Sequence, residues 1–356
     1  MKNYFPLPEW HTQAATILVW PHRYSDWANM LDEISTTYVE ITHALTQVQN
    51  VIIIYFNNEH KLYIKKLCNE YCCNMQNIIM IKIETNDTWV RDYGPQILLG
   101  NKEYQYIDLE FNAWGEHYAC RLDNLFSESL FKLVISEQCQ YHRSPLVLEG
   151  GNLEFDSNAT LLTNIACVKR NLQKENIDKE KLIESIKYEL SAKHVLSVDV
   201  PALTGDDTGG HIDTLARFID DNTIVYAACH DPDHPDHSCL LLLLTQLRAL
   251  KTKQGKPYEL IPVPLPKILI ELDKNIFAPA SYINFVFAND IILVPMHDDE
   301  HDQLALDIFD SACPDRKVVG INAKSLLKQY GSLHCSTLQI PENVIDSNKI
   351  KQEIHE

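Results

Sequence analysis

The stretch Val51-Ile52-Ile53-Ile54-Tyr55-Phe56 predicts a strand that is buried on both faces, because its apolar side chains do not alternate with polar ones. Comparable apolar runs lie at residues 16–20 and 78–83. Between these runs, residues 26–49 and 59–73 place apolar side chains at helical spacing. The resulting order of strand, helix, strand, helix and strand predicts an α/β fold.

Strand pairs joined by short turns interrupt this alternation in the rest of the chain. We expect hairpins at residues 211–228 and 283–295, followed by helices at residues 238–250 and 302–311. Further strands are predicted at residues 96–99, 104–109, 159–164, 195–200, 317–321 and 335–340, and further helices from residue 123, at residues 172–190 and at residues 323–328. Strand pairs followed by one helix favour repeated mixed α/β modules over a doubly wound sheet.

The composition is that of a folded globular chain. The 356 residues are 45% hydrophobic and 22% charged, and the formal net charge is −18. This negative charge argues against nucleic acid and anionic membranes as partners and favours cationic ligands. We expect one domain over residues 1–340 and a polar C-terminal tail over residues 341–356. Whether the chain forms a homo-oligomer stays open.

The N-terminus lacks an apolar run long enough for a secretory signal. The leucine run at residues 240–244 is far too short to span a bilayer. We therefore expect a cytoplasmic protein whose ten cysteines are mostly reduced.

Polar side chains gather beside glycine or aromatic turns in five segments that are far apart in the sequence. These segments are residues 89–92, the turn around Trp114, and residues 149–151, 207–213 and 331–335. Loops at one end of a scaffold commonly build active sites, so one cysteine, one histidine and several carboxylates on such loops predict a nucleophilic site. Cys335 is the natural nucleophile because it lies in a loop, whereas most other cysteines lie in helix or strand patterns. A buried cysteine that only fills space is the alternative.

The segment Gly205-Asp206-Asp207-Thr208-Gly209-Gly210-His211-Ile212-Asp213 carries the densest chemistry. We predict that it runs into a strand at residues 214–219, so that His211 and Asp213 project from the same face. The two glycines before His211 supply backbone freedom for a sharp turn or for close approach to a ligand. A hairpin loop with a surface histidine is the alternative.

Several motifs occur together in the order seen in agmatine deiminases. They are Asn86-Asp87-Thr88-Trp89-Val90-Arg91-Asp92-Tyr93-Gly94-Pro95, Leu148-Glu149-Gly150-Gly151, Gly210-His211-Ile212-Asp213 and His334-Cys335. Pro8-Glu9-Trp10 and Trp20-Pro21-His22 also resemble the N-terminal signature of that family. Each motif alone is a weak signal, but together they are highly specific and cover nearly the whole chain. The chain therefore resembles the agmatine deiminases of the guanidino-group-modifying superfamily.

The resemblance implies a fold and a set of catalytic roles. The implied fold is a pseudo-fivefold α/β propeller of ββαβ modules around a central active site, which agrees with the mixed modules above. The implied roles are Cys335 as nucleophile on the guanidinium carbon, His211 as general acid and base, Asp92 and Asp213 as the guanidinium clamp, and Glu149 as support for the polar pocket. Carboxylates suit this task because a planar guanidinium donates forked hydrogen bonds that they accept in pairs. The same carboxylates should oppose an anion on Cys335 in the empty enzyme, so we expect the cationic substrate to help form the thiolate.

The implied reaction releases ammonia from agmatine, a small cationic guanidinium substrate, and leaves N-carbamoylputrescine on the way to putrescine and polyamine biosynthesis. It passes through a covalent amidino-cysteine intermediate and requires neither a metal nor an organic cofactor. Trp89 is expected to contact the substrate, with core packing as the alternative. Asp207 matches a position that carries an acidic residue near the distal amine, so it would repel the α-carboxylate of arginine. Free and peptidyl arginine are the rival substrates.

Two functions of a different class stay open. Histidine and aspartate are dense at residues 230–237 and 297–301, so a zinc hydrolase is one alternative. A proline-stiffened loop explains the first stretch, and an acidic helix start explains the second. The other alternative is a guanidinium-binding protein without turnover. The presence of Cys335 and His211 beside both clamp aspartates argues against it.

Overall fold

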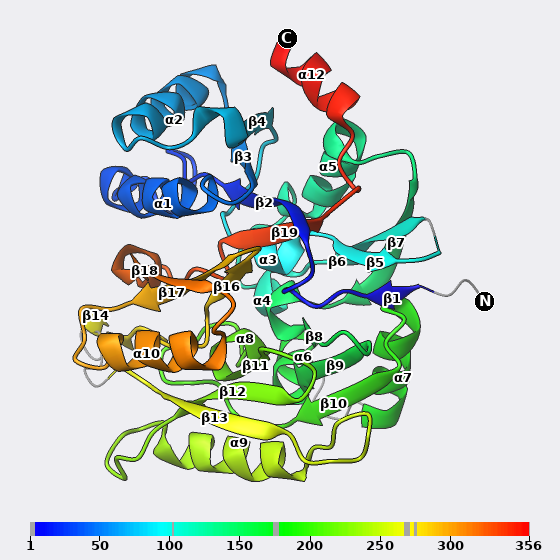
Figure 1. Cartoon of the computed structure of the whole chain (residues 1–356), viewed down its shortest axis with the longest axis vertical. Coiled ribbons are helices and arrows are strands. Elements are labelled where there is room, and N and C mark those ends of the chain that lie inside the picture. Colours follow the sequence, from blue (N-terminus) through cyan, green and yellow to red (C-terminus); the bar gives the residue numbers. More distant parts are fainter. Residues whose placement is uncertain (1–3, 102, 174–177, 267–270, 274–275, 356) are drawn as a thin grey trace.

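The structure is a computed structural model that describes residues 4–101, 103–173, 178–266, 271–273 and 276–355. Long helices lie on the outside and strands run through the interior (Figure 1). Several helices consist of a single turn. These one-turn elements are α3 (Val90–Tyr93), α4 (Ala113–Glu116), α8 (Ile212–Leu215) and α11 (Lys324–Leu327), with the 3₁₀ helices η1 (Met75–Asn77), η2 (Asp123–Leu125) and η3 (Gly150–Asn152). None of the helices in this described part is both long and apolar enough to cross a membrane.

The apolar stretch that begins the sequence analysis forms an interior strand of a four-stranded sheet. The strands of this sheet run in the order β19 (Thr337–Pro341), β2 (Gln13–Val19), β3 (Asn50–Tyr55) and β4 (Ile78–Lys82). β19 is antiparallel to β2, whereas β2, β3 and β4 are parallel. The two crossovers are α1 (Leu31–Leu45) and α2 (Asn58–Glu70). The predicted alternation of strands and helices is confirmed here, and a strand from the far end of the chain completes the sheet.

Four further sheets repeat an antiparallel pair followed by a parallel neighbour. Their strands are β5 (Gln96–Leu99), β6 (Tyr104–Glu110) and β7 (Cys139–Val147); β8 (Glu154–Phe155), β9 (Thr160–Asn164) and β10 (His194–Val198); β11 (Ala216–Phe218), β12 (Thr223–Ala228) and β13 (Glu259–Pro264); and β16 (Val286–Ala288), β17 (Ile291–Met296) and β18 (Lys317–Asn322). The crossover helices are α5 (Phe126–Val134), α6 (Ile165–Asn171) with α7 (Lys179–Glu189), α9 (His237–Ala249) and α10 (Asp302–Ala312). Five sheets of the described chain therefore share one strand order, as the expectation of mixed α/β modules requires.

Two small additions complete the strand inventory. The short strand β1 (Phe5–Pro6) pairs with β5 and extends its sheet. A separate two-stranded sheet joins β14 (Glu271–Asp273) to β15 (Ile276–Phe277). Neither addition repeats the strand order of the five modules.

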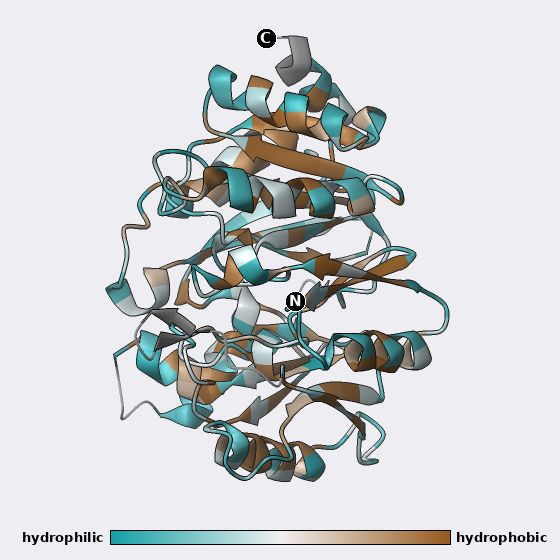
Figure 2. Cartoon of the chain, turned by 90° about the vertical axis from the view of Figure 1, so that its left-hand side faces the viewer, coloured by the Kyte–Doolittle hydropathy of each residue, from teal (hydrophilic) through white to brown (hydrophobic). Residues whose placement is uncertain are grey.

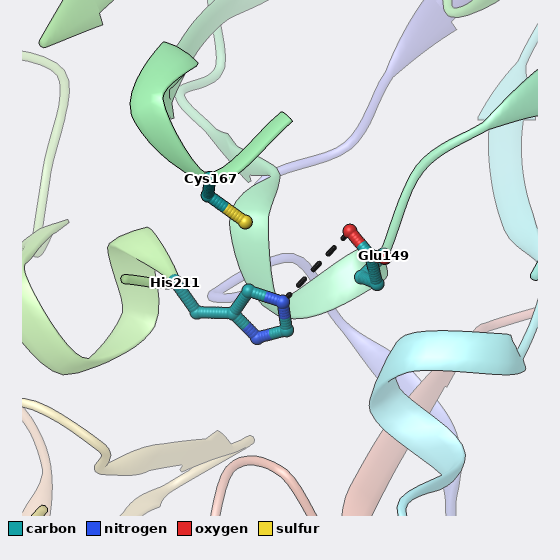
Figure 3. A group of neighbouring side chains, drawn as sticks. All are labelled: Glu149, Cys167 and His211. Atoms are coloured by element: carbon teal, nitrogen blue, oxygen red, sulfur yellow. Dashed lines mark ion pairs between the residues drawn. The ribbon is translucent and has the colours of Figure 1, made fainter. Parts of the chain in front are cut away.

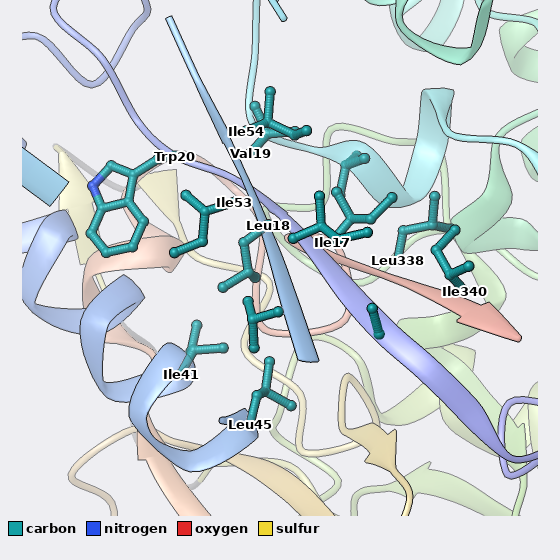
Figure 4. Packing of buried hydrophobic residues seen from close by; sticks show 14 of the residues in the cluster. Ile17, Leu18, Val19, Trp20, Ile41, Leu45, Ile53, Ile54, Leu338 and Ile340 are labelled. Atoms are coloured by element: carbon teal, nitrogen blue, oxygen red, sulfur yellow. The ribbon is translucent and has the colours of Figure 1, made fainter. Parts of the chain in front are cut away.

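Buried apolar side chains hold each sheet to its helices. In the largest cluster, Leu18 of β2 and Ile53 of β3 lie on the side of the sheet that faces Ile41 and Leu45 of α1, whereas Ile17 lies on the other side, near Leu338 of β19 (Figure 4). Complete burial of one such side chain stabilises the folded state by about 1.5–3 kcal/mol. Interior strands are coloured brown in Figure 2, while the outer helices carry both brown and teal residues. The hydropathy of the sequence therefore accounts for which elements lie inside.

The predicted strand at residues 211–219 is wrong in its first half. Ile212–Leu215 form helix α8, and only Ala216–Phe218 are extended as β11. The hydroxyl of Thr214 donates to the carbonyl of His211 at 2.9 Å, which stabilises a turn in competition with the extended backbone. His211 and Asp213 therefore do not share a face of a strand, and a helical turn positions them instead.

Strand β13 and helix α12 (Ser347–His355) are among the elements that lie outside the predicted pattern. Strand β13 contains Pro262 and Pro264, which cannot donate backbone hydrogen bonds. These prolines are tolerated because β13 lies at the edge of its sheet. Part of the predicted polar tail forms helix α12, in which Ile350 is buried. The predicted helix at residues 172–190 corresponds to α7, with residues 174–177 outside the described residues. The division into one domain and a tail stays a prediction.

Candidate active site

The polar motif segments lie directly before the first strand of each of the five sheets. These segments carry Asp92 before β5, Glu149 before β8, His211 and Asp213 before β11, Asn284 before β16 and Cys335 before β19. The same place in each module therefore supplies one or two polar side chains. This recurrence explains how residues that are far apart in the sequence come together.

Gly151 marks the point at which three of these segments converge. A Cβ atom at this position would lie 2.6 Å from His211 Nδ1, 2.7 Å from Asp92 Oδ1 and 3.1 Å from Asp213 Oδ2. The backbone N–H of Gly151 donates to Asp92 Oδ1 at 2.9 Å. Only glycine leaves room for this approach of an imidazole and two carboxylates.

Cys335 lies in a turn just before β19, with 8% of its surface exposed. Asn284 fixes this turn, because its Oδ1 accepts from the N–H of His334 at 2.9 Å and its Nδ2 lies 3.4 Å from Cys335 Sγ. The sulfur also lies 3.9 Å from Asp213 Oδ2. Burial and the carboxylates of Asp213 and Asp92 raise the pKa of the Cys335 thiol well above its ordinary value. The ligand-free protein therefore holds Cys335 as a thiol.

Asp213 belongs to a chain of buried charged groups. Its Oδ2 lies 2.8 Å from His334 Nδ1, and His334 Nε2 lies 2.6 Å from Glu9 Oε2, which is in turn 2.9 Å from Arg217 Nη2. Burial opposes ionisation of Asp213, but the hydrogen bond and charge of His334 outweigh it and lower the pKa of this carboxyl. Asp213 is therefore held as a carboxylate beneath the cysteine.

The ring of His211 lies between two other carboxylates. Nδ1 is 3.6 Å from Asp92 Oδ1, and Nε2 is 3.9 Å from Glu149 Oε2 (Figure 3). Neither ring nitrogen has a hydrogen-bond partner of normal geometry among the described residues, although His211 is only 1% exposed. Burial disfavours the imidazolium, but the charge of Asp92 is the largest of the opposing effects, which together hold the pKa of His211 well above its ordinary value. The ring can therefore carry a proton that it offers to a ligand.

Glu149 is oriented by one neighbour and remains open on its other side. Asn171 Nδ2 donates to Glu149 Oε1 at 3.1 Å, while Oε2 faces His211. Burial raises the pKa of Glu149, and the charge of His211 acts in the opposite direction. A bound cation would add to the effect of His211 and favour the carboxylate.

Trp114 reaches Asp92 from a strained turn. Its Nε1 donates to Asp92 Oδ2 at 2.9 Å. Ala113, Trp114 and Glu116 have φ values of 52°, 55° and 68°, in the left-handed region that costs about 1–2 kcal/mol per non-glycine residue. Such strain persists where the surrounding structure holds it in place, and here the bond to a buried carboxylate contributes to that.

A cavity beside these groups is lined by Trp89, Asp92 and Cys335. The ring of Trp89 also packs on Trp27, with 5.7 Å between ring centroids, and only 5% of Trp89 is exposed. A Cβ atom at Gly331 would lie 2.3 Å from the Trp89 ring, so the ring packs directly against this glycine. Trp89 thus combines core packing with a place in the cavity wall.

The lining of the same cavity is also acidic. Asp207 belongs to it, and the hydroxyl of Tyr118 donates to Asp207 Oδ2 at 3.2 Å. Burial and the neighbouring Asp206 raise the pKa of Asp207 to about 6. This carboxyl is therefore mostly ionised at neutral pH and adds a negative charge to the cavity wall.

Four of the seven predicted site residues line this cavity, namely Trp89, Asp92, Asp207 and Cys335, and the other three contact these residues or one another. The other three are Glu149, His211 and Asp213. Asn284 and Tyr118 had no assigned place in the sequence analysis. Asn284 falls in the predicted strand at residues 283–288, but β16 begins only at Val286. Asparagine is frequent in turns, and this was the one sequence signal for a turn at that position.

The described residues contain one group of three potential metal ligands with close ligand atoms. This group is Glu149, Cys167 and His211, and each of its members is buried. Neither of the stretches at residues 230–237 and 297–301, which suggested a zinc hydrolase, forms such a group.

Comparison with known proteins places these features in a family. Residues 5–341 match the family model described as Porphyromonas-type peptidyl-arginine deiminase. A Legionella pneumophila protein provisionally named agmatine deiminase is 28% identical over 348 residues, which cover 96% of this chain and 97% of that protein. A cysteine-to-serine variant of C. jejuni agmatine deiminase, solved with substrate bound, is 30% identical with a TM-score of 0.87 over 96% of this chain and 97% of that chain. A Porphyromonas gingivalis structure provisionally named arginine deiminase is 37% identical with a TM-score of 0.87, over 97% and 100% of the two chains.

Proposed function

This chain belongs to the family of Porphyromonas-type peptidyl-arginine deiminases, and we propose that it acts as an agmatine deiminase. It hydrolyses the guanidinium of agmatine to N-carbamoylputrescine and ammonia. The observation that carries the proposal is the approach of His211, Asp92 and Asp213 to one point beside Cys335. Guanidinium hydrolysis needs these groups, because carboxylates hold the planar cation while a thiol attacks its carbon and an imidazole moves protons. The names of the Legionella and C. jejuni relatives support the same activity.

The carboxylates bind the guanidinium in a fixed orientation. Asp213 Oδ1 is buried without a hydrogen-bond partner among the described residues, while Oδ2 is held by His334. A buried carboxylate oxygen without a partner is costly, so a ligand N–H that reaches it is strongly favoured. Asp92 lies on the other side of the same point and completes the clamp. Trp89 contacts the aliphatic part of the substrate, and Asp207 binds its distal ammonium.

The reaction begins with attack of Cys335 on the guanidinium carbon. As the cation enters, the thiol proton leaves the site, so the positive ligand offsets the new negative charge on sulfur. The sulfur–carbon bond forms and the carbon–nitrogen π pair moves to nitrogen, which gives a tetrahedral adduct. The imidazolium of His211 then donates its proton to the leaving nitrogen, and the carbon–nitrogen bond breaks with release of ammonia. A covalent amidino-cysteine remains.

The second half of the reaction hydrolyses this intermediate. His211, now neutral, removes a proton from water, and the hydroxide adds to the same carbon. The carbon–sulfur bond breaks, its electron pair returns to Cys335, and the hydroxyl proton of the adduct passes to the sulfur as the ureido product leaves. His211 serves as the acid that protonates the leaving ammonia and as the base that activates water, so these steps call for neither a metal nor an organic cofactor.

One assay tests the proposal directly. The wild-type chain should release ammonia from agmatine, and Cys335→Ser should lower turnover by roughly 10³-fold or more while agmatine still binds. Cys313→Ser, a matched change at a buried cysteine near the end of α10, should retain turnover. Full activity of Cys335→Ser would refute the assignment of the nucleophile.

Arginine is the second candidate substrate, since one relative is provisionally named arginine deiminase. The negative charge of Asp207 in the cavity wall favours a substrate that ends in an ammonium over one that also carries a carboxylate. Agmatine, arginine and an arginyl peptide compared side by side should therefore rank with agmatine first. Faster turnover of arginine would transfer the proposed activity to that substrate.

We infer further that the five modules are arranged as a pseudo-fivefold α/β propeller around this site. The shared strand order of the five sheets and the site residue before each of them support this arrangement. We also place the reaction in the cytoplasm, because the ten cysteines are unpaired, as thiols are in a reducing compartment.

A further inference from the structure

Cys167 lies beside the catalytic imidazole, although the reaction proposed above gives it no role. It is fully buried on helix α6, and its sulfur lies with a nitrogen of His211 and a carboxylate oxygen of Glu149 in a group whose ligand atoms are all within 4.8 Å of one another. Figure 3 shows the three side chains directed toward a common space. Thiolate, imidazole and carboxylate are the three ligand types that Zn²⁺ takes in proteins.

The spacing of the three ligand atoms suits a single metal ion. Tetrahedral zinc with bonds of about 2.0–2.3 Å places its ligand atoms roughly 3.3–3.8 Å apart. His211 Nε2 and Glu149 Oε2 are already 3.9 Å apart. All three ligand atoms lie within 4.8 Å of one another, so small side-chain rotations would bring them to bonding distance from one ion. Water would fill the fourth position.

The neighbours of the group orient its ligand atoms toward this space. Asn171 Nδ2 donates to Glu149 Oε1 at 3.1 Å and lies 3.5 Å from Cys167 Sγ, so the other carboxylate oxygen faces the histidine. Asp92 Oδ1 lies 3.6 Å from His211 Nδ1, the ring nitrogen that faces away from Glu149. A carboxylate on the second ring nitrogen is the usual companion of a metal-bound histidine. Both ring nitrogens of the buried His211 also lack hydrogen-bond partners of normal geometry in this part of the chain.

We propose that Glu149, Cys167 and His211 form an inhibitory zinc site. Binding of Zn²⁺ releases the proton of the Cys167 thiol and the proton of the His211 imidazolium, and the metal takes the electron pairs that they leave. This inference rests on the proposed function, since a His211 that is bonded to metal can no longer transfer protons during deimination. Cys335 is not a member of a three-ligand group in the described chain, so the nucleophile is not the thiol that recruits the metal.

Zinc binding is measured first on the full-length chain carrying Cys335→Ser, which removes the nucleophile from the comparison. Titration against a chromophoric chelator should give one Zn²⁺ per chain, and Co²⁺ in place of Zn²⁺ should produce a thiolate charge-transfer absorption. Adding Cys167→Ala should weaken zinc binding by at least about 10–100-fold and abolish that absorption. Adding Cys313→Ala, a buried thiol outside the group, is the matched control and should change neither measurement.

Turnover of agmatine is then measured with and without Zn²⁺. Zn²⁺ should lower the turnover of the wild type, and a higher agmatine concentration should lessen this inhibition. Addition of a chelator should restore turnover. Relative to its own zinc-free rate, Cys167→Ala should tolerate at least tenfold more zinc. Three outcomes would each overturn the proposal. The Cys335→Ser chain could fail to bind zinc, the zinc affinity could be the same with and without Cys167, or turnover could be faster in the presence of zinc. Failure of zinc-free wild type to act on agmatine would instead count against the proposed function, because zinc binding is measured without turnover.

Discussion

His334 Nδ1 lies 2.8 Å from Asp213 Oδ2, so the histidine next to the nucleophile fixes the carboxylate that lies 3.9 Å from Cys335 Sγ. Its other ring nitrogen lies 2.6 Å from Glu9 Oε2. Two motifs from opposite ends of the chain, Pro8-Glu9-Trp10 and His334-Cys335, therefore meet in one hydrogen-bonded chain beneath the site. The N-terminal motif acts on the chemistry through His334 and Asp213, without facing the cavity itself.

Replacing His334 with alanine should move the pH dependence of the reaction. The hydrogen bond and charge of His334 lower the pKa of Asp213 against the effect of burial, so their loss raises that pKa. The carboxylate that accepts from the guanidinium is then protonated at a higher pH. We expect the acidic limb of the kcat/KM profile to shift to higher pH, and kcat/KM to fall by roughly 10–100-fold, the worth of a hydrogen bond to a charged group.

His334→Asn separates this effect from general damage to the site. The asparagine amide can donate to Asp213 from a position near that of Nδ1, although it loses the contact with Glu9. Its acidic limb should therefore lie closer to that of the wild type than the limb of His334→Ala. A His334→Ala profile that drops equally at every pH would show that the histidine does not set the pKa of Asp213.

Gly151→Ala should abolish most activity with little change in the rest of the fold. The added methyl group would lie within 3.1 Å of polar atoms of His211, Asp92 and Asp213, so at least one of them must move. Misplacement of a reacting group by about 1 Å costs roughly 100-fold in rate. Ammonia release from agmatine measures this loss, and circular dichroism with thermal unfolding shows whether the variant is folded. A folded variant with wild-type kcat/KM would contradict the convergence of these groups at Gly151.

The sequence predicts regular elements well where apolar spacing decides them. Strand β3 lies within one residue of its predicted bounds, and helix α1 occupies the middle of the predicted residues 26–49, because unbroken apolar runs and helical spacing bury the same side chains in any α/β sheet. Helix α8 was missed because one local hydrogen bond, from Thr214 to the carbonyl of His211, outweighs a strand-like pattern. Strand β13 was missed because prolines usually argue against a strand.

The site itself was predictable only in part from the residues. Glycines, carboxylates and one loop cysteine marked the correct segments, but their roles came from the resemblance to a family. Asn284 and Trp114 act through geometry that no local pattern records, one by bonding the turn of Cys335 and the other by a left-handed backbone that aims its indole at Asp92. Such contacts join residues that are distant in the sequence, so only the assembled fold reveals them.

Cationic reagents should alkylate Cys335 faster than neutral ones. Burial and the carboxylates of Asp213 and Asp92 raise the pKa of this thiol, so the thiolate is scarce until a cation enters the cavity. A haloacetamidine should therefore inactivate the enzyme faster than a haloacetamide, after correction for their reactivity toward a free thiol. Mass spectrometry should place the label on Cys335 and find none at that position in Cys335→Ser. Equal corrected rates would rule out cation-assisted formation of the thiolate.

Asp207 should set the preference for agmatine and its dependence on pH. Its pKa is raised to about 6 by burial and by Asp206, so the carboxylate loses its charge as the pH falls from 7 to 5. We expect kcat/KM for agmatine to fall over this range, mostly through KM. Asp207→Asn should raise KM by roughly 10–100-fold at neutral pH, with a smaller change in kcat, because in the proposed complex the lost charge binds the distal ammonium and not the guanidinium.

Two further variants identify the group that titrates. Tyr118→Phe keeps the charge of Asp207 but removes the 3.2 Å hydrogen bond that lowers its pKa. The rise in KM at acidic pH should therefore begin at a higher pH, but KM at neutral pH should not rise as strongly as in Asp207→Asn. Asp87 lines the same cavity, and burial raises its pKa to about 7, so Asp87→Asn tests whether it produces the rise in KM at acidic pH instead. If Asp207 binds the distal ammonium, only Asp207→Asn should both abolish this rise and narrow the ratio of agmatine to arginine turnover. An unchanged ratio in that variant would show that the charge of Asp207 does not exclude the α-carboxylate of arginine, so that selectivity arises elsewhere in the cavity.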